Sequence, residues 1–214
     1  MSLATARKTD HYTWSDYQCW PDDQRWEIIG GDAFDMSPAP LTRHQAIVGE
    51  LHLQIATFLK SHKCKAFVSP TDVKLSEEDV VQPDLLVVCD QTQVKRTHIE
   101  GPPALVVEVV SEATLVHDRV HKFRLYARAG IPEYWIVTPY PHLIEVYELR
   151  GEHYVLSGGY SENEAVLSRS FHELALDMRR IFDFPLEDGE KVKMVREAHP
   201  SYGAGSPAAN AAAK

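Results

Sequence analysis

The amino-acid sequence predicts a single α/β domain in which helices flank one mixed β-sheet. Short apolar runs typical of strands alternate with segments of helical periodicity, which is the pattern of this fold class. A chain of 214 residues is long enough to bury one sizeable core. Small and polar residues dominate after residue 186, so the domain is expected to span residues 1–186, with a disordered tail over 187–214.

The first elements are a hairpin and a helix. Residues 25–38 read RWEIIGGDAFDMSP, and Gly30 and Gly31 suit the positive φ angles of a tight hairpin turn. Thr42, followed three residues later by Gln45, matches a capping box. A helix with one apolar face is therefore expected from Thr42 to about Lys60.

Strands and one further helix fill the rest of the domain. The run 66–75 predicts a strand interrupted near Ser69 and Pro70, and 80–90 predicts another, with Pro83 at a bulge, at an edge or at its start. After the buried strand 104–111, a helix is expected from Ala113 to Arg128, because Gly130 and Pro132 then terminate it. Later segments predict three more stretches, namely a strand over 133–139, a hairpin over 143–156 and a short helix or turn over 171–182.

Composition narrows the class of protein. The net charge of −9 argues against nonspecific nucleic-acid binding, although residues 117–128 contain four basic residues and one acid. No apolar run approaches the roughly 20 residues that span a bilayer, so no membrane association is expected. Cys19, Cys64 and Cys89 show no C-x-x-C spacing, which favours reduced thiols and a cytoplasmic location.

Glu108 lies in the middle of the apolar run ALVVEVVS. A buried carboxylate is strongly disfavoured unless it is paired, protonated or bound to a metal. Asp84 likewise precedes the apolar run Leu85–Val88, and two neighbouring strands would bring these two acids together. A divalent cation would relieve their repulsion, and oxygen ligands favour Mg²⁺ or Mn²⁺ over zinc.

The helix after Glu108 places Asp118, Lys122 and Tyr126 at successive i, i+4 positions. The stem of Lys122 can cross the apolar edge and bring its ammonium near the carboxylates, where it would orient a water or stabilise charge on a phosphate. Tyr126 would support it by a hydrogen bond.

Three motifs resemble those of the Uma-type restriction-endonuclease family, within the PD-(D/E)xK nuclease superfamily. They are Q-P-D at 82–84, L-V-V-E-V-V-S at 105–111 and D-x-x-x-K-x-x-x-Y-A-x-A-G-I-P-E-Y-W-I-V from Asp118. The likeness covers roughly residues 25–184. It implies a restriction-endonuclease-like core, Asp84 and Glu108 as metal ligands, and phosphodiester hydrolysis. The superfamily's usual lysine position holds Val110 here, so Lys122 is the expected replacement.

Structural roles compete with these catalytic ones. In the structural alternative, Glu108 is the partner of a core-edge arginine or lysine in an ion pair, and Asp84 caps a turn or a strand end. Asp118 and Lys122 then form an ion pair on the exposed face of the helix. His44 and Glu50 on the first long helix are expected to be structural residues. The alternative, for both, is a position near the metal site.

Three functions remain open on the sequence alone. The preferred one is a metal-dependent endonuclease acting on DNA, with Asp84, Glu108 and Lys122 as catalytic residues. The rivals are a nuclease-fold protein that binds nucleic acid without cleaving it, and an enzyme for smaller phosphate esters. A homodimer is expected by analogy with small nucleases of this fold.

Overall fold

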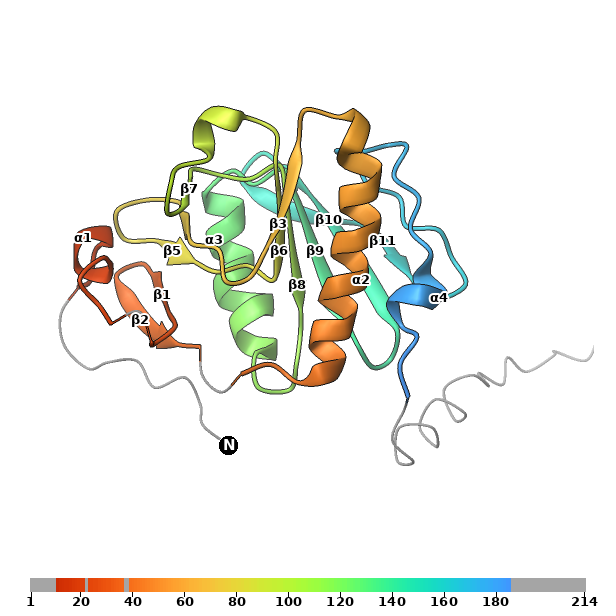
Figure 1. The fold of residues 1–214 in the computed structure, drawn as a ribbon, viewed down its shortest axis with the longest axis horizontal. Coiled ribbons are helices and arrows are strands. Elements are labelled where there is room, and N and C mark those ends of the chain that lie inside the picture. The colour runs from red at the N-terminus through yellow and green to blue at the C-terminus, as the bar shows by residue number, and fades with distance from the viewer. Residues whose placement is uncertain (1–10, 22, 37–38, 186–214) are drawn as a thin grey trace, which may run out of the picture. The chain divides into compact units, whose positions relative to one another are not determined.

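The computed structural model describes residues 11–21, 23–36 and 39–185. Its strands form two mixed sheets (Figure 1). The smaller sheet has the strand order β2 (Asp32–Asp35), β1 (Trp26–Ile29), β5 (Val80–Val81), β4 (Val73–Lys74) and β7 (Ile99–Glu100). The larger has the order β11 (His153–Tyr160), β10 (Leu143–Arg150), β9 (Glu133–Thr138), β8 (Leu105–Val109), β6 (Leu85–Val88) and β3 (Lys65–Val68).

The predicted class, a mixed α/β fold with flanking helices and an N-terminal hairpin, is confirmed. The expectation of one sheet is wrong. Pro83 explains the difference, because it has no N–H for a strand ladder and separates β5 from β6. The apolar run 80–90, expected to be one strand, therefore contributes to both sheets, and Asp84 lies at the junction.

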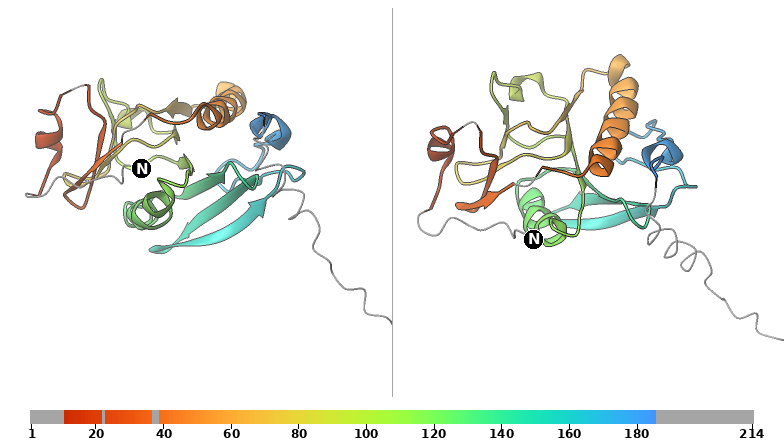
Figure 2. Two further views of the ribbon diagram at one scale, coloured as in Figure 1. Left: turned by 90° about the horizontal axis from the view of Figure 1, so that it is seen from below. Right: turned by 60° about the horizontal axis from the view of Figure 1, so that its bottom comes forward.

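Two long helical segments cover opposite faces of the six-stranded sheet (Figure 2). One segment is α2 (Thr42–Phe58), and the other is a π-helical turn, η3 (His117–Lys122), continued by α3 (Phe123–Arg128). Side chains alternate between the faces of a strand. Leu85 and Val107 accordingly pack on the α2 side, whereas Leu86 and Val106 pack on the α3 side.

The remaining helical elements are short. They are α1 (Trp14–Tyr17), the 3₁₀ turns η1 (Leu59–Ser61) and η2 (Gln91–Gln93), and α4 (Met178–Ile181). The expected capping box on α2 is wrong, because Thr42 already lies inside the helix. Leu41 occupies the N-cap position with extended backbone angles and makes no side-chain cap.

The crossover between β8 and β9 is helical, and these two strands pair in parallel. Its end agrees with the prediction, since α3 ends at Arg128 and Gly130, two residues later, has a φ of 80°. Its beginning does not, because residues 112–114 form turns and the helical segment starts at 115 as α-helix before the π-helical turn. The π-helical turn lies where the crossover passes the paired acids, and such turns are frequent at functional sites.

The N-terminal hairpin is held against the loop before β5. Gly30 and Gly31 have φ angles of 59° and 83°, as expected for the turn. Their amides donate to Asp79 Oδ1 at 2.8 Å and to the Glu78 carbonyl at 3.0 Å. One side of β1 faces η3, because Glu27 contacts His117 and Lys122 there.

Cys64 and Cys89 form a disulfide, so the expectation of three reduced thiols is wrong; Cys19 is free. Antiparallel pairing of β3 with β6 places Lys65 opposite Val88, and therefore Cys64 opposite Cys89. This pairing depends on strand register and is invisible in local cysteine spacing. Within the described residues no helix has the length and apolar character of a membrane span. The tail expected over 187–214 lies outside the described residues.

Candidate active site

Asp84 and Glu108 face each other across β6 and β8. Leu85 pairs with Val107 in these antiparallel strands, which puts Asp84 opposite Glu108. The Val109 amide donates to Asp84 Oδ2 at 2.8 Å, and the Asp84 amide lies 3.4 Å from Glu108 Oε2. Each acid is thus tied to the other's strand, and the structure brings the two predicted ligands together.

Lys122 points at Glu108 from the π-helical turn. Its Nζ lies 2.9 Å from Glu108 Oε1, and the residue is only 1% exposed. Tyr126 donates to the same oxygen at 2.7 Å, so it supports Glu108 rather than Lys122. Asp118 Oδ1 lies 3.8 Å from the ammonium. Asp118 and Lys122 are both buried, which rules out the exposed helix pair considered from the sequence.

Glu27 completes this group and was missed in the sequence. Its side chain is fully buried, with Oε1 2.8 Å from Lys122 Nζ and Oε2 2.8 Å from His117 Nε2. It also accepts the backbone N–H of Gln82 at 2.8 Å. The signal was available, because Glu27 interrupts the apolar β1 just as Glu108 interrupts β8.

Three carboxyl groups surround the Lys122 ammonium, those of Glu27, Glu108 and Asp118, and the Asp84 carboxyl group lies beside Glu108. Burial raises the pKa of Glu108 well above its usual range despite Lys122, and the Asp84 and Asp118 carboxylates add to the increase. Burial likewise raises the pKa of Asp118 to about 6. The site therefore has more carboxyl groups than Lys122 can neutralise, and burial with their mutual repulsion favours the protonated form of Glu108.

Two opposite shifts identify the ion pair inside this group. Burial alone would raise the pKa of Glu27, but Lys122 and His117 more than offset it and hold this pKa at about 2. Burial alone would lower the pKa of Lys122, but Glu108 and Glu27 together raise it well above its usual range. Lys122 and Glu27 thus form a charged pair in the interior.

The donor chemistry suits a small divalent cation that retains water ligands. Within the described parts of the chain, no three Asp, Glu, His or Cys side chains form a group that could hold a metal ion. Mg²⁺, however, usually binds through one or two carboxylates and keeps several waters. Asp84 and Glu108 provide such a pair, and an added cation would relieve the repulsion from Asp84 that helps to raise the pKa of Glu108.

The two residues of α2 considered from the sequence have different positions. His44 Nε2 lies 3.0 Å from Asp84 Oδ2, and its Nδ1 is buried without a hydrogen-bond partner among the described residues. His44 therefore borders the site. Glu50 instead contacts Gln54 and, at 3.1 Å, Arg180 of α4, so these contacts lie outside the acid group.

The basic character of residues 117–128 is largely neutralised. Lys122 is buried, Arg119 pairs with Glu145, and Arg128 pairs with Asp79 at 3.0 Å. Arg124 is exposed. The basic helix inferred from the sequence is therefore not a continuous positive surface.

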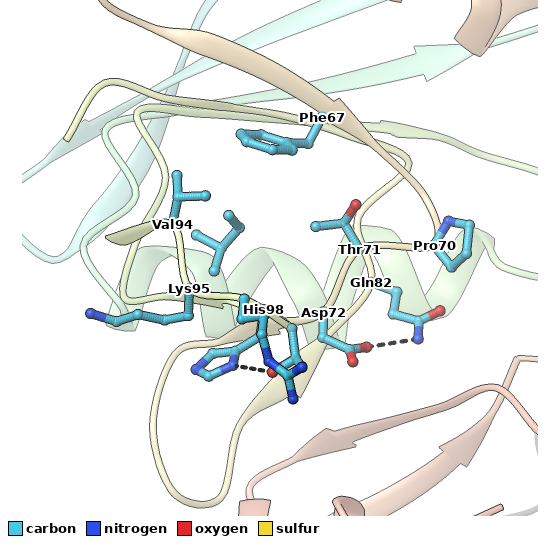
Figure 3. Close-up of a pocket in the computed structure, with 11 residues that line it drawn as sticks. Phe67, Pro70, Thr71, Asp72, Gln82, Val94, Lys95 and His98 are labelled. Carbon is cyan, nitrogen blue, oxygen red and sulfur yellow. Dashed lines mark hydrogen bonds between the residues drawn. The ribbon is translucent and has the colours of Figure 1, made fainter. Parts of the chain in front are cut away.

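A cavity of about 260 Å³ adjoins the polar network around Gln82 (Figure 3). Phe67, Val94 and Ile99 form part of its wall, and Asp72 and Gln82 lie at its polar side, joined by a 2.8 Å hydrogen bond. Neither Asp84 nor Glu108 lines it. Gln82 thus lines the cavity only two residues before Asp84, but the cavity is separate from the acid pair.

An α/β fold with paired acids at a strand junction and a buried lysine beside them defines a nuclease-like class of protein. The chain belongs to the Uma2 family, described as "Putative restriction endonuclease", whose model matches residues 14–179. An uncharacterized protein of Synechocystis sp. (strain ATCC 27184 / PCC 6803 / Kazusa) is 30% identical over 138 residues, 62% of this chain and 71% of that protein.

The fold is also similar to a solved structure from Anabaena variabilis ATCC 29413, described as a "putative nuclease belonging to DUF820". The TM-score is 0.64 at 18% sequence identity, and the match covers 79% of this chain and 97% of the other.

Proposed function

We propose that this protein is a metal-dependent endonuclease that hydrolyses phosphodiester bonds in DNA. The observation that carries the proposal is the convergence of Asp84 and Glu108 beside the buried ammonium of Lys122. Membership of a family described as restriction endonucleases supports the reaction class. The acids would hold Mg²⁺ or Mn²⁺, which when bound supplies an activated water and neutralises phosphate charge.

The chain's own groups have distinct parts in this proposal. Asp84 is fixed by the Val109 amide and by His44, so its orientation does not depend on a ligand. Tyr126 and Lys122 both donate to Glu108 Oε1, which leaves Oε2, among the residues that the structure describes, with only the 3.4 Å contact to the Asp84 amide. Lys122 also supplies positive charge where a phosphate would react.

The test is cleavage of supercoiled plasmid by purified protein with Mg²⁺, Mn²⁺ or EDTA. Cleavage should require the cation, and Glu108→Gln should abolish it and weaken Mn²⁺ binding in calorimetry. Glu50→Gln serves as the matched control, because Glu50 pairs with Arg180 away from the acid group. Undiminished cleavage by the Glu108 variant would contradict the proposal.

One observation favours a second candidate, a nuclease-fold protein that binds nucleic acid without turnover. Lys122 is held between two carboxylates at 2.8 and 2.9 Å, which neutralises its charge before any phosphate arrives. Retained binding of DNA, with no cleavage under any divalent cation, would favour this candidate.

A further inference from the structure

We propose that Arg25 binds a phosphate of the nucleic-acid backbone next to the reacting one, an inference that rests on the proposed function. Arg25 directly precedes β1. Its Nε donates to Gln82 Oε1 at 2.9 Å and its Nη2 donates to Ser69 Oγ at 2.6 Å. Both acceptors are neutral, so they fix the guanidinium without neutralising it.

The charge of Arg25 distinguishes it from the paired basic residues. Arg119, Arg128, Arg150 and Arg180 each form an ion pair with a carboxylate. Within residues 11–21, 23–36 and 39–185, Arg25 forms no such pair. A guanidinium has five N–H donors, and two of them are used, so the others can meet an anion in a forked geometry.

Two independent connections place Arg25 beside the acid pair. Gln82 is two residues from Asp84, and the Ser69 amide donates to the Asp84 carbonyl at 3.1 Å. Arg25 and Glu27 also share one side of the chain, because side chains two residues apart in a strand lie on the same face. On that face Glu27 contacts Lys122, and Lys122 in turn contacts Glu108.

Gln82 joins these groups into one preorganised unit. Its side-chain oxygen accepts from Arg25, its side-chain amide donates to Asp72 at 2.8 Å, and its backbone N–H donates to Glu27 at 2.8 Å. A residue held from three sides cannot move far, so the guanidinium keeps a constant position relative to the acids.

The substrate chemistry requires a cation here. Each strand of duplex DNA carries one phosphate per about 3.4 Å of helix axis, and the acid group would repel the neighbours of the reacting phosphate. Lys122 is 1% exposed and cannot reach them, whereas Arg25 is partly exposed and lines a cavity of about 270 Å³. Asp23 and Asp35 line the same cavity, so Asp23→Asn should strengthen binding.

The experiment measures binding of a fluorescent duplex oligonucleotide between 50 and 200 mM KCl, with Ca²⁺ in place of Mg²⁺. Arg25→Gln should weaken binding roughly tenfold at 50 mM, and the slope of log K against log salt should fall by about 0.9. Arg25→Lys keeps the charge and should retain most of the slope. Arg150→Gln, which removes a charge paired with Glu148, should leave both quantities unchanged.

Thermal melting checks that the Arg25 variants are folded, and plasmid cleavage is measured in parallel. If the wild type binds or cleaves DNA while Arg25→Gln behaves as Arg150→Gln does, the assignment of Arg25 is wrong and the proposed function stands. If the wild type neither binds nor cleaves, both proposals are overturned.

Discussion

Glu27 Oε1 and Lys122 Nζ lie 2.8 Å apart in the interior, although one belongs to the N-terminal hairpin and the other to the crossover between β8 and β9. The pair joins an element of the smaller sheet to the acids of the larger one. Glu27 therefore determines where the Lys122 ammonium lies, and the consequences are measurable.

Glu27→Gln should destabilise the fold by about 1–3 kcal/mol, because Lys122 stays buried with one close carboxylate instead of two. Urea unfolding at pH 7 measures this change. Glu148→Gln is the control, since its exposed pair with Arg150 should contribute less than about 1 kcal/mol. Equal effects in the two variants would contradict a structural role for the buried pair.

Lys122→Met should reduce turnover by about 10²- to 10³-fold, the scale of one lost transition-state donor. The contacts show that it should also cost about 3–5 kcal/mol of stability, because Glu27 and Glu108 lose their shared cation. Single-turnover cleavage and urea unfolding measure the two effects. Mn²⁺ affinity should stay constant or rise, and a marked loss of affinity would argue that the lysine shapes the metal site.

Asp118 gives the stability a defined pH dependence. Burial raises its pKa from 3.8 to about 6 in the folded protein, so the folded state holds this proton more tightly than the unfolded state. Its contribution is fully present below pH 3.8 and is lost as the pH rises through 6, by about 3 kcal/mol. Asp118→Asn should remove this component and stabilise the protein at pH 8. Urea unfolding of both forms from pH 4 to 8 tests it; parallel curves would contradict it.

The Cys64–Cys89 disulfide should contribute about 3 kcal/mol, because it closes a loop with a sequence separation of 25 and restricts the unfolded chain. A Cys64→Ser/Cys89→Ser protein should therefore melt at lower temperature than the oxidised wild type. Cys19→Ser, which removes the free thiol, should melt like the wild type. No difference on reduction with dithiothreitol would show that the bond adds nothing.

Local pattern was enough to predict most of the elements and the acid pair. Alternating apolar residues and the Gly30-Gly31 turn identified the hairpin, and Glu108 was conspicuous because charge in an apolar strand needs compensation. The division into two sheets and the Cys64–Cys89 bond could not be predicted, because both depend on which strands become neighbours.

Glu27 was missed for a different reason. It carries the same signal as Glu108, an acid within an apolar strand, but a hairpin near the chain's start is commonly read as exposed on one face. Its burial follows from packing against η3, through His117 and Lys122. The compensating charge is 90 or more positions away in sequence, so no local pattern connects them.

The π-helical turn at His117–Lys122 affects how related chains are aligned. Loss of a single residue there would restore an ordinary helical turn and rotate everything before it by about 100°. A relative with a regular helix would then present its equivalent lysine one column away from Lys122. An alignment without a gap in this turn would therefore show that relative as lacking the lysine. Whether a relative has the lysine is better judged by superposing its structure than by comparing alignment columns.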